Sequence, residues 1–365
     1  MKFKDIKKGI WNINYSLKAT AFRATGFPHI LPKTTWLAIT YKCNSRCKMC
    51  SIWKRYKKEP EKIKDEMTFK EFAAFINKNK FLRDIALSGG EPFLQPDLNK
   101  MFLYLDRKGY ATGTATNAIM KDFIIKSEEE LLSKLSGRHP HGLEVSIDGL
   151  FEEHDRVRGT KGLFDRAVEI VKWGIGAQKR YPFFSIVVSH TITSHNYKKL
   201  LDFVDFFVGL GLKPEQISFR TAQIAKFYGN EETKEVPLDM SALIKQIKKV
   251  QAKYEYFRKN WFYANMINYL KNPKGFRIPC YAAISFCYID PYWDVYPCTY
   301  WAKPIGNLRK ANFDLKKIWK SKEARIARKC IAQNKCPNCW TGCNTIPSRM
   351  SDSRRLINYY LGLIR

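Results

Sequence analysis

Short apolar runs alternate with longer amphipathic segments from residue 34 to residue 221, and this alternation constrains the fold more than any other feature of the chain. Strands that alternate with helices along a sequence form βαβ units and a parallel sheet, so the predicted fold class is α/β. Mostly apolar strands are typical of such a sheet, because both of its faces are buried. The sequence predicts strands at residues 34–41, 84–88, 111–116, 143–148, 184–191 and 216–221.

One of the intervening segments contains a clear helix start. Thr68, followed three residues later by Glu71, matches a capping box, in which the two side chains satisfy each other's backbone amides. Phe72, Phe75 and Ile76 then fall on one face of the expected helix. We therefore expect an amphipathic helix that packs against the sheet.

The length of the chain predicts more than one folding unit. It has 365 residues, of which 45% are apolar, whereas a single core usually stops growing near about 250–300 residues. A helical stretch from about residue 239 ends at Asn272-Pro273, and cysteines reappear soon afterwards. The predicted divisions are an N-terminal segment at 1–33, a core domain at 34–275, a cysteine-rich domain at 276–348 and a tail at 349–365.

Both ends of the chain combine basic and apolar residues. Residues 1–24 predict a basic amphipathic helix, because apolar residues follow helical spacing and the lysines lie largely off that stripe. Such a helix either packs against the core domain as a cap or lies in a membrane interface. Residues 354–361 have a similar character. The apolar stripe consists of Phe3, Ile6, Ile10, Ile13 and Leu17.

The composition argues against several classes of protein. No apolar run approaches the ~18 residues of a membrane-spanning helix. No signal peptide precedes the 10 cysteines, so we expect reduced or metal-bound thiols in the cytoplasm rather than secreted disulfides. The net charge of +30 attracts phosphates, anionic lipids or acidic peptides, but no nucleic-acid-binding motif accompanies it. We expect no specific nucleic-acid partner, and peripheral contact with the inner membrane surface stays an open alternative.

Three cysteines follow the first expected strand within a single loop, at Cys43, Cys47 and Cys50. A closed zinc or iron–sulfur site has four protein ligands. The next cysteine is Cys280, and no histidine lies within this loop. Either a remote ligand completes the site, or one coordination position is left open for chemistry.

This C-x3-C-x2-C spacing, followed by Gly89-Gly90-Glu91-Pro92 after the second expected strand, resembles the radical S-adenosylmethionine (radical SAM) superfamily. The resemblance implies a partial (β/α)6 TIM-type barrel with a small cysteine-rich C-terminal extension. It also implies that the three cysteines hold a [4Fe–4S] cluster whose open iron binds S-adenosylmethionine. Two glycines suit a close approach of backbone to a ligand, because glycine has no Cβ.

Further residues resemble the cofactor-binding elements of the superfamily. Asn117 lies in a Thr-Asn-Ala sequence similar to the TNG element, with Ala118 in place of its glycine. Arg158 is similar to the arginine that pairs with the cofactor carboxylate, a role that suits a bidentate guanidinium. Met49 takes the place of the apolar residue beside adenine. The complete cofactor-binding set implied by the resemblance is Met49, Gly89, Gly90, Glu91, Asn117, Ser146, Asp148 and Arg158.

The remaining cysteines are concentrated near the C-terminus, at Cys280, Cys287, Cys298, Cys330, Cys336, Cys339 and Cys343. This density indicates one or two further metal clusters, with zinc as the alternative metal. The layout resembles the SPASM or twitch extension of radical SAM enzymes, although Asp294 stands where that extension usually has glycine. All seven cysteines could serve two [4Fe–4S] clusters, and Cys287 and Cys330 fit the pattern least. A single auxiliary cluster would draw on Cys280, Cys298, Cys336 and Cys339.

The resemblance implies an enzyme of oxidoreductase or transferase type. One electron from an external donor such as flavodoxin or ferredoxin drives reductive cleavage of S-adenosylmethionine to a 5′-deoxyadenosyl radical, which abstracts hydrogen from the substrate. A peptide or protein substrate is the leading hypothesis, because members with a SPASM extension largely act as maturases. The second hypothesis is a lipid or polyprenyl-linked substrate at a membrane surface. The third is a non-enzymatic iron–sulfur redox sensor or nucleic-acid binder. The sequence names neither the substrate nor the bond that changes.

Overall fold

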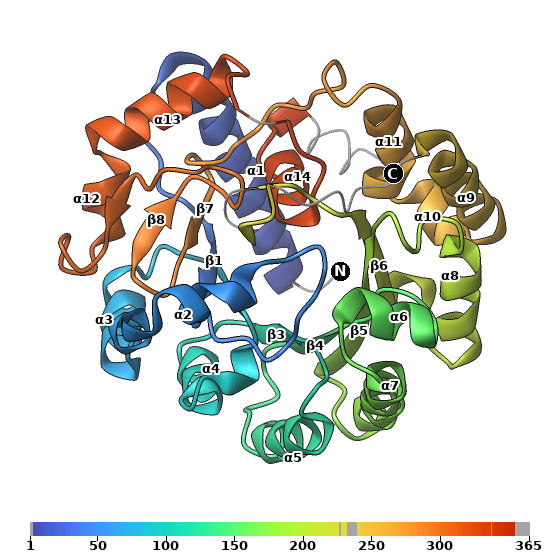
Figure 1. The fold of residues 1–365 in the computed structure, drawn as a ribbon. Coiled ribbons are helices and arrows are strands. Elements are labelled where there is room, and N and C mark those ends of the chain that lie inside the picture. Colours follow the sequence, from blue (N-terminus) through green and yellow to red (C-terminus); the bar gives the residue numbers. More distant parts are fainter. Residues whose placement is uncertain (1–2, 226–227, 232–238, 337, 355–365) are drawn as a thin grey trace.

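A computed structural model of the chain describes residues 3–225, 228–231, 239–336 and 338–354. The first six strands form the predicted parallel barrel, which is partial and carries its helices on the outside (Figure 1). The sheet pairings are β2-β1 and β3-β4-β5-β6, all parallel, and β2 packs beside β3. These strands are β1 Thr34–Ala38, β2 Asp84–Ser88, β3 Thr112–Thr116, β4 His141–Ser146, β5 Phe184–Ile192 and β6 Ile217–Thr221.

The outer layer consists of helices that connect one strand to the next. Thr68 and Glu71 form the predicted capping box at the start of α3, and Phe72, Phe75 and Ile76 are buried on its inner face. The barrel helices are α3 Phe69–Lys78, α4 Leu98–Arg107, α5 Lys121–Leu132, α6 Glu152–Arg158, α7 Leu163–Arg180 and α8 Leu200–Gly209. The predicted helical stretch after β6 divides into α9 Met240–Lys253, α10 Glu255–Lys259 and α11 Trp261–Lys271.

Two strands differ from their predicted bounds where side chains take over the backbone hydrogen bonds. The first strand ends at Ala38 because the Thr40 hydroxyl and the Tyr41 amide both donate to the carboxylate of Glu66. The fourth begins two residues early and ends at Ser146, since the Asp148 amide donates to Nδ1 of His154. The predicted site residues Cys43 and Asp148 therefore lie on loops beyond the strand ends, and Ser146 is the last residue of its strand.

The sheet continues beyond the boundary predicted near residue 275. Strand β7, Phe286–Ile289, pairs in parallel with the free edge of β1, with Cys287 opposite Thr35. Strands β8, Asp294–Tyr296, and β9, Gly306–Asn307, then add an antiparallel hairpin. The cysteine-rich region therefore shares a sheet with the barrel. Its helices are α12 Leu315–Trp319, α13 Lys322–Ala332 and α14 Gly342–Arg349, with the short α2 Arg55–Lys58 following the first cysteine loop.

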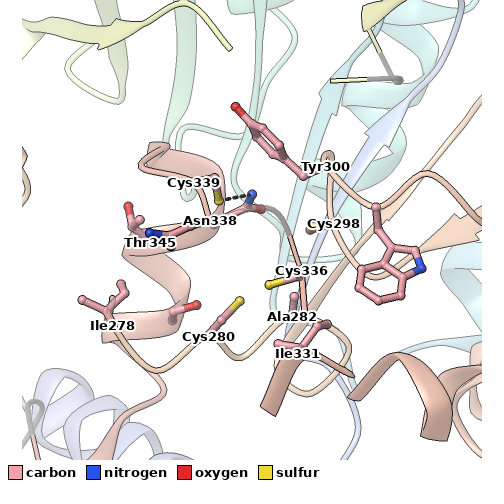
Figure 2. A pocket seen from close by; sticks show the side chains of 13 residues that line it. Ile278, Cys280, Ala282, Cys298, Tyr300, Ile331, Cys336, Asn338, Cys339 and Thr345 are labelled. Atoms are coloured by element: carbon pink, nitrogen blue, oxygen red, sulfur yellow. Dashed lines mark hydrogen bonds between the residues drawn. The ribbon is translucent and has the colours of Figure 1, made fainter. Parts of the chain in front are cut away.

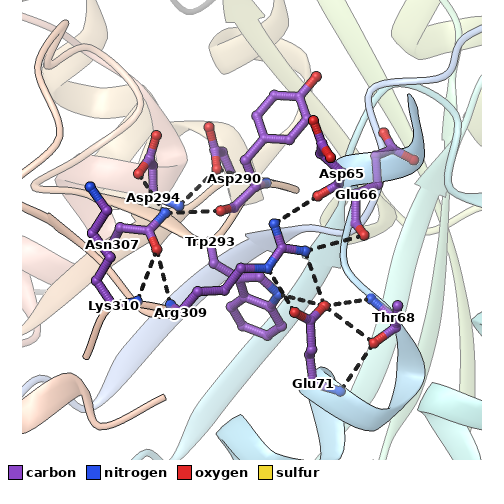
Figure 3. Close-up of polar contacts among 11 residues, drawn as sticks. Asp65, Glu66, Thr68, Glu71, Asp290, Trp293, Asp294, Asn307, Arg309 and Lys310 are labelled. Atoms are coloured by element: carbon purple, nitrogen blue, oxygen red, sulfur yellow. Dashed lines mark hydrogen bonds and ion pairs between the residues drawn. The ribbon is translucent and has the colours of Figure 1, made fainter. Parts of the chain in front are cut away.

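A polar network fastens this C-terminal hairpin to the start of α3 (Figure 3). Arg309 donates from Nε to Oε1 of Glu71 over 2.7 Å, and from Nη1 to the Asp65 carbonyl over 2.9 Å. The indole of Trp293 donates to Oε2 of the same glutamate over 3.3 Å. The half-buried carboxylate of Glu71 thus serves both the helix cap and the junction between the two regions.

The N-terminal helix α1, Phe3–Thr25, packs against the cysteine-rich region rather than standing apart. Ala19 and Phe22 are buried in a cluster that includes Tyr281. Arg23 donates to the carbonyl of Cys280 over 3.2 Å. One alternative predicted packing against the core domain; the structure shows α1 packed on the protein with these contacts in the cysteine-rich region, and membrane contact stays a prediction. The tail predicted at 349–365 lies outside the described residues from position 355 onward, and no helix within the described ranges has the length and apolar content needed to cross a bilayer.

Candidate functional site

The first three cysteines lie on the loop that follows β1, at the C-terminal end of the barrel strands. Cys43, Cys47 and Cys50 are half-buried. Burial is the main cause that raises the pKa of Cys43 to about 11 and that of Cys50 to about 12, and the neighbouring Cys47 contributes to both shifts. Thiols that raise each other's pKa lie close together, and only a bound cation would stabilise all three as thiolates.

Polar groups already point at these sulfurs. The Ser45 hydroxyl lies 3.0 Å from Sγ of Cys47, and the Asn117 amide lies 3.9 Å from Sγ of Cys43. No three histidine, cysteine or carboxylate side chains in the described part of the chain converge as ligands of a single metal ion do. In an iron–sulfur cluster each thiolate binds a different iron, so its ligands need not converge on one point. Three thiols on one loop are a donor set that suits an iron–sulfur cluster.

The two glycines after β2 are required by contact with the cysteine loop itself. A Cβ on Gly89 would lie 2.4 Å from the Thr40 carbonyl oxygen, and one on Gly90 would lie 2.3 Å from that of Lys42. The Gly90 amide donates to the Thr40 carbonyl over 2.8 Å. The glycines thus allow two backbone segments to touch, which is a different reason from the expected approach to a ligand.

Glu91 is fully buried and accepts hydrogen bonds from three protein groups. Its carboxylate receives the Asn117 amide over 2.7 Å, the Thr116 hydroxyl over 3.1 Å and the Phe93 amide over 3.2 Å. Burial raises its pKa to about 7, although these donors oppose the shift. Within the structure Glu91 braces the ends of β2 and β3, and it positions Asn117 beside Asn44.

Arg158 and Asp148 form a buried ion pair behind the cysteine loop. Nε of Arg158 donates to Oδ2 of Asp148 over 2.6 Å, and the Thr191 amide donates to Oδ1 over 2.6 Å. Burial alone would raise the pKa of Asp148, but the Arg158 charge holds it below its usual value. The structure thus places Asp148 behind Arg158, as a residue that orients the guanidinium.

The last two residues of the predicted cofactor set lie at the same end of the barrel. Met49 is half-buried, and its carbonyl accepts from the Asn230 side chain over 2.8 Å. Ser146 is half-buried at the end of β4. Asn230, which also donates to the Gln223 carbonyl over 2.7 Å, had no signal in the sequence.

The sequence analysis did not predict a polar pair inside the barrel. Arg220 on β6 donates to Glu144 on β4 over 2.9 Å and to the Ser189 hydroxyl on β5 over 2.6 Å. Cys343 lies near the same guanidinium. The alternation of polar and apolar residues along the strand could have indicated this pair, because Glu144 and Ser146 are polar and alternate with apolar neighbours.

Four of the C-terminal cysteines line one pocket (Figure 2). They are the four that the single-cluster prediction named, Cys280, Cys298, Cys336 and Cys339. The Asn344 amide points at Sγ of Cys339 over 3.3 Å, and burial raises the pKa of that thiol to about 12. A pocket lined by four thiols has the donor set of a [4Fe–4S] cluster.

The other three cysteines lie outside this pocket lining. Cys287 is buried in β7 with its sulfur 3.6 Å from the Thr35 hydroxyl, and no other thiol is among the groups that shift its pKa. The prediction of Cys287 as a ligand is therefore not supported, because its side chain belongs to the sheet. Cys330 on α13 acts electrostatically on Cys336, and Cys343 on α14 lies by Arg220.

Comparison with known proteins agrees with this geometry. Residues 37–207 match the family model of the radical SAM superfamily, and residues 280–344 match that of SPASM, an iron–sulfur cluster-binding domain. An AdoMet-dependent heme synthase of Methanosarcina barkeri is 23% identical over 80% of this chain and 83% of its own length. The subtilosin biosynthesis protein AlbA of Bacillus subtilis is 22% identical over 84% of this chain and 65% of its own.

Two solved structures share the fold. Streptococcus suis SuiB, bound to its precursor peptide SuiA, superposes with a TM-score of 0.62 and 16% identity, covering 93% of this chain and 76% of SuiB. The enzyme anSMEcpe, with bound AdoMet and the Cp18Cys peptide, has a TM-score of 0.58 and 15% identity, covering 91% and 100%.

Proposed function

Because this chain belongs to the radical SAM superfamily and carries a SPASM iron–sulfur cluster-binding domain, we propose that it is an enzyme that modifies a peptide or protein by hydrogen abstraction. The observation that carries the proposal is the pairing of two cysteine sets. An open three-cysteine loop at the mouth of the barrel is followed by a pocket that holds four more thiols.

The residues of the first site divide into ligands and positioning groups. We assign Cys43, Cys47 and Cys50 to the cluster. When bound, the cluster and S-adenosylmethionine supply a 5′-deoxyadenosyl radical. We assign Arg158, which pairs with Asp148, to bind the cofactor carboxylate. Gly89, Gly90, Glu91 and Asn117 would shape the backbone that binds the cofactor, and Met49 and Ser146 would complete the binding set.

A peptide substrate is supported by several similar proteins. They include AlbA, the sporulation killing factor maturation protein SkfB of Bacillus subtilis and the PqqA peptide cyclase of Rhizobium meliloti. SuiB was solved with its precursor peptide. The second candidate is a tetrapyrrole substrate, which the heme synthase of Methanosarcina barkeri favours because the similarity spans most of both chains.

The proposal also includes the division into domains, the electron donor and the location of the protein. Core residues 34–275 would hold the first cluster and residues 276–348 the auxiliary one. We propose a flavodoxin- or ferredoxin-type electron donor and a cytoplasmic location. The lipid hypothesis has less support, since α1 packs on the protein, although Ile10 and Leu17 stay exposed on it.

The test is a comparison of the anaerobically reconstituted protein with its Cys43→Ala, Cys47→Ala, Cys50→Ala variant. With sodium dithionite as the electron source, the unaltered protein should convert S-adenosylmethionine to methionine and 5′-deoxyadenosine, and the variant should not. The variant should retain about four irons per chain, because one four-thiol pocket remains. Cleavage by the variant would overturn the first site, and zinc or no metal in it would overturn the auxiliary site. Incubation with candidate peptides or tetrapyrroles, read by mass spectrometry, separates the two substrate classes.

A further inference from the structure

A basic and aromatic patch lies directly beside the first cysteine loop. It consists of Trp53, Lys54, Lys57 and Lys58, at the start of and within α2. All three lysines are exposed, and none forms an ion pair with an acidic side chain in the described ranges. Lys54 and Lys57 place their ammonium groups 5.2 Å and 4.8 Å from the centre of the Trp53 ring. The patch therefore keeps its positive charge available to a partner.

The patch is connected to the metal site by one hydrogen bond. The half-exposed indole of Trp53 donates from Nε1 to the carbonyl oxygen of Cys50 over 3.0 Å. The cation–π contacts order the lysines around that ring. A partner that lies on the lysines is thus separated from a cluster ligand by a single aromatic side chain.

The first cysteine loop itself carries further positive charge next to the cluster site. Arg46 and Lys48 are exposed between the first and third cysteines, and neither has an acidic partner within the described residues. Positive side chains of the loop and of α2 thus flank the site on the protein surface, whereas a substrate for hydrogen abstraction has to enter the barrel. A partner bound at this surface does not enter the barrel, yet it lies close to the cluster site.

We propose that this patch docks an acidic one-electron carrier protein that reduces the cluster held by Cys43, Cys47 and Cys50. The partner fits by charge, because the patch is basic within a chain of net charge +30. One electron passes from the reduced flavin of the carrier to the cluster, and the flavin is oxidised by one electron. The inference rests on the proposed function, since it requires that cluster.

The experiment compares two charge-reversed variants of the reconstituted holoprotein. The patch variant is Lys54→Glu, Lys57→Glu, Lys58→Glu. The matched control is Lys245→Glu, Lys248→Glu, Lys249→Glu on the exposed face of α9, which changes the net charge by the same amount. The first readout is the affinity for a purified oxidised flavodoxin, measured by fluorescence anisotropy at low and high salt. The second is 5′-deoxyadenosine formation with reduced flavodoxin or with sodium dithionite.

The patch variant should bind flavodoxin about tenfold more weakly at low salt, and the difference should shrink at high salt. Flavodoxin-driven cleavage should fall in parallel while dithionite-driven cleavage stays unchanged. The control variant should differ from the unaltered protein by less than about twofold. The neutral variant Lys54→Gln, Lys57→Gln, Lys58→Gln should show an intermediate loss of affinity.

Equal losses of flavodoxin affinity in the patch and control variants would overturn the proposal, because the net charge of the protein would then explain binding without this patch. Unchanged flavodoxin binding by the patch variant would also overturn the proposal. The same holds if the patch variant loses binding to an acidic peptide but keeps its binding to flavodoxin. Failure of the proposed function gives a different result, namely no dithionite-driven cleavage by the unaltered protein.

Discussion

Asp148 determines how Arg158 is presented at the site. The carboxylate holds Nε of the guanidinium and is itself fixed by the Thr191 amide, so the aspartate acts through the arginine. The pair is buried, and its charges compensate each other there. A carboxylate that locks a guanidinium in one orientation prepares it for a second, bidentate contact.

Replacing Asp148 by asparagine should therefore weaken binding of S-adenosylmethionine without removing iron. The amide keeps a hydrogen-bond acceptor for Thr191 but loses the charge that orients Arg158. We expect about a tenfold loss of affinity, or ~1.4 kcal/mol, by equilibrium dialysis of the reconstituted protein. Iron content should match that of the unaltered protein, and a melting curve checks that the variant is folded. Unchanged affinity would show that Asp148 has no positioning role.

Ala118 occupies a backbone conformation that suits glycine. Its φ is 66°, and the residue is completely buried. An L-residue in the left-handed region costs about 1–2 kcal/mol, whereas glycine gains unfolded-state entropy worth about 0.4–1 kcal/mol. Ala118→Gly should accordingly stabilise the protein by about 0.5–1 kcal/mol in urea unfolding. As a matched change, Ala177→Gly inside α7 should destabilise it by about 1 kcal/mol. If both substitutions destabilise equally, strain at position 118 is absent.

The part of the site that could be predicted consists of motifs whose residues lie close together in the sequence. The cysteine loop and the glycine pair are short motifs whose spacing carries their chemistry. The brace made by Glu91 and the pair Arg220–Glu144 depend on contacts between separate strands. Such contacts follow from the register of the sheet, which no local pattern specifies. The contact of the two glycines with the Thr40 and Lys42 backbone was not predicted for the same reason, and their approach to the cofactor stays a prediction.

At the scale of elements, Glu71 joins α3 to the C-terminal hairpin. Burial would raise its pKa, but hydrogen bonds and charge from Arg309 lower it to about 2. A carboxyl whose pKa is lower in the folded state stabilises the fold above its ordinary pKa of about 4.3 and loses that contribution as the pH falls toward 2. The two side chains are partly exposed, so solvent screening reduces the effect.

Arg309→Gln should lower the free energy of unfolding at pH 7 by about 1 kcal/mol. The difference between variant and unaltered protein should shrink between pH 4.5 and pH 2, since protonation of Glu71 removes the same interaction. Thermal melts across that range measure it. The nearby substitution Lys310→Gln serves as the control, because the Lys310 side chain makes no ion pair in the described residues. A difference that stays constant to pH 2 would contradict the assignment.

The elements themselves were largely predictable, and their exceptions have local causes. Apolar runs located all six barrel strands, and the pair Thr68 and Glu71 located the start of α3. The early end of β1 was not predictable, because the acceptor that draws Thr40 out of the sheet is Glu66 on a later segment. Strand β7 was missed because its partner, β1, lies some 250 residues away in the sequence; its opposed residues Thr35 and Cys287 are 252 apart.

At the scale of the whole molecule, the cysteine-rich region completes the barrel on one side. Strand β1 lies between β2 and β7, so both of its edges are paired. Helix α1 in turn buries Ala19 and Phe22 against Tyr281 and Phe286. The two ends of the chain therefore enclose the N-terminal strand of the barrel between them. The boundary predicted near residue 275 marks a change in composition, but the sheet crosses it.

Removal of residues 276–365 should consequently unfold more than the second cysteine site. The fragment 1–275 would expose the edge of β1, an apolar parallel strand whose amides and carbonyls between Thr34 and Leu37 would lose their partners. It would also expose the inner face of α1. Unpaired apolar edges drive aggregation, so the purified fragment should aggregate or lack a cooperative melting transition. Coexpression of 276–365 should restore solubility, because the missing strand is then available to pair. A monomeric fragment 1–275 that melts cooperatively would contradict this view, since it would show that the barrel folds without β7.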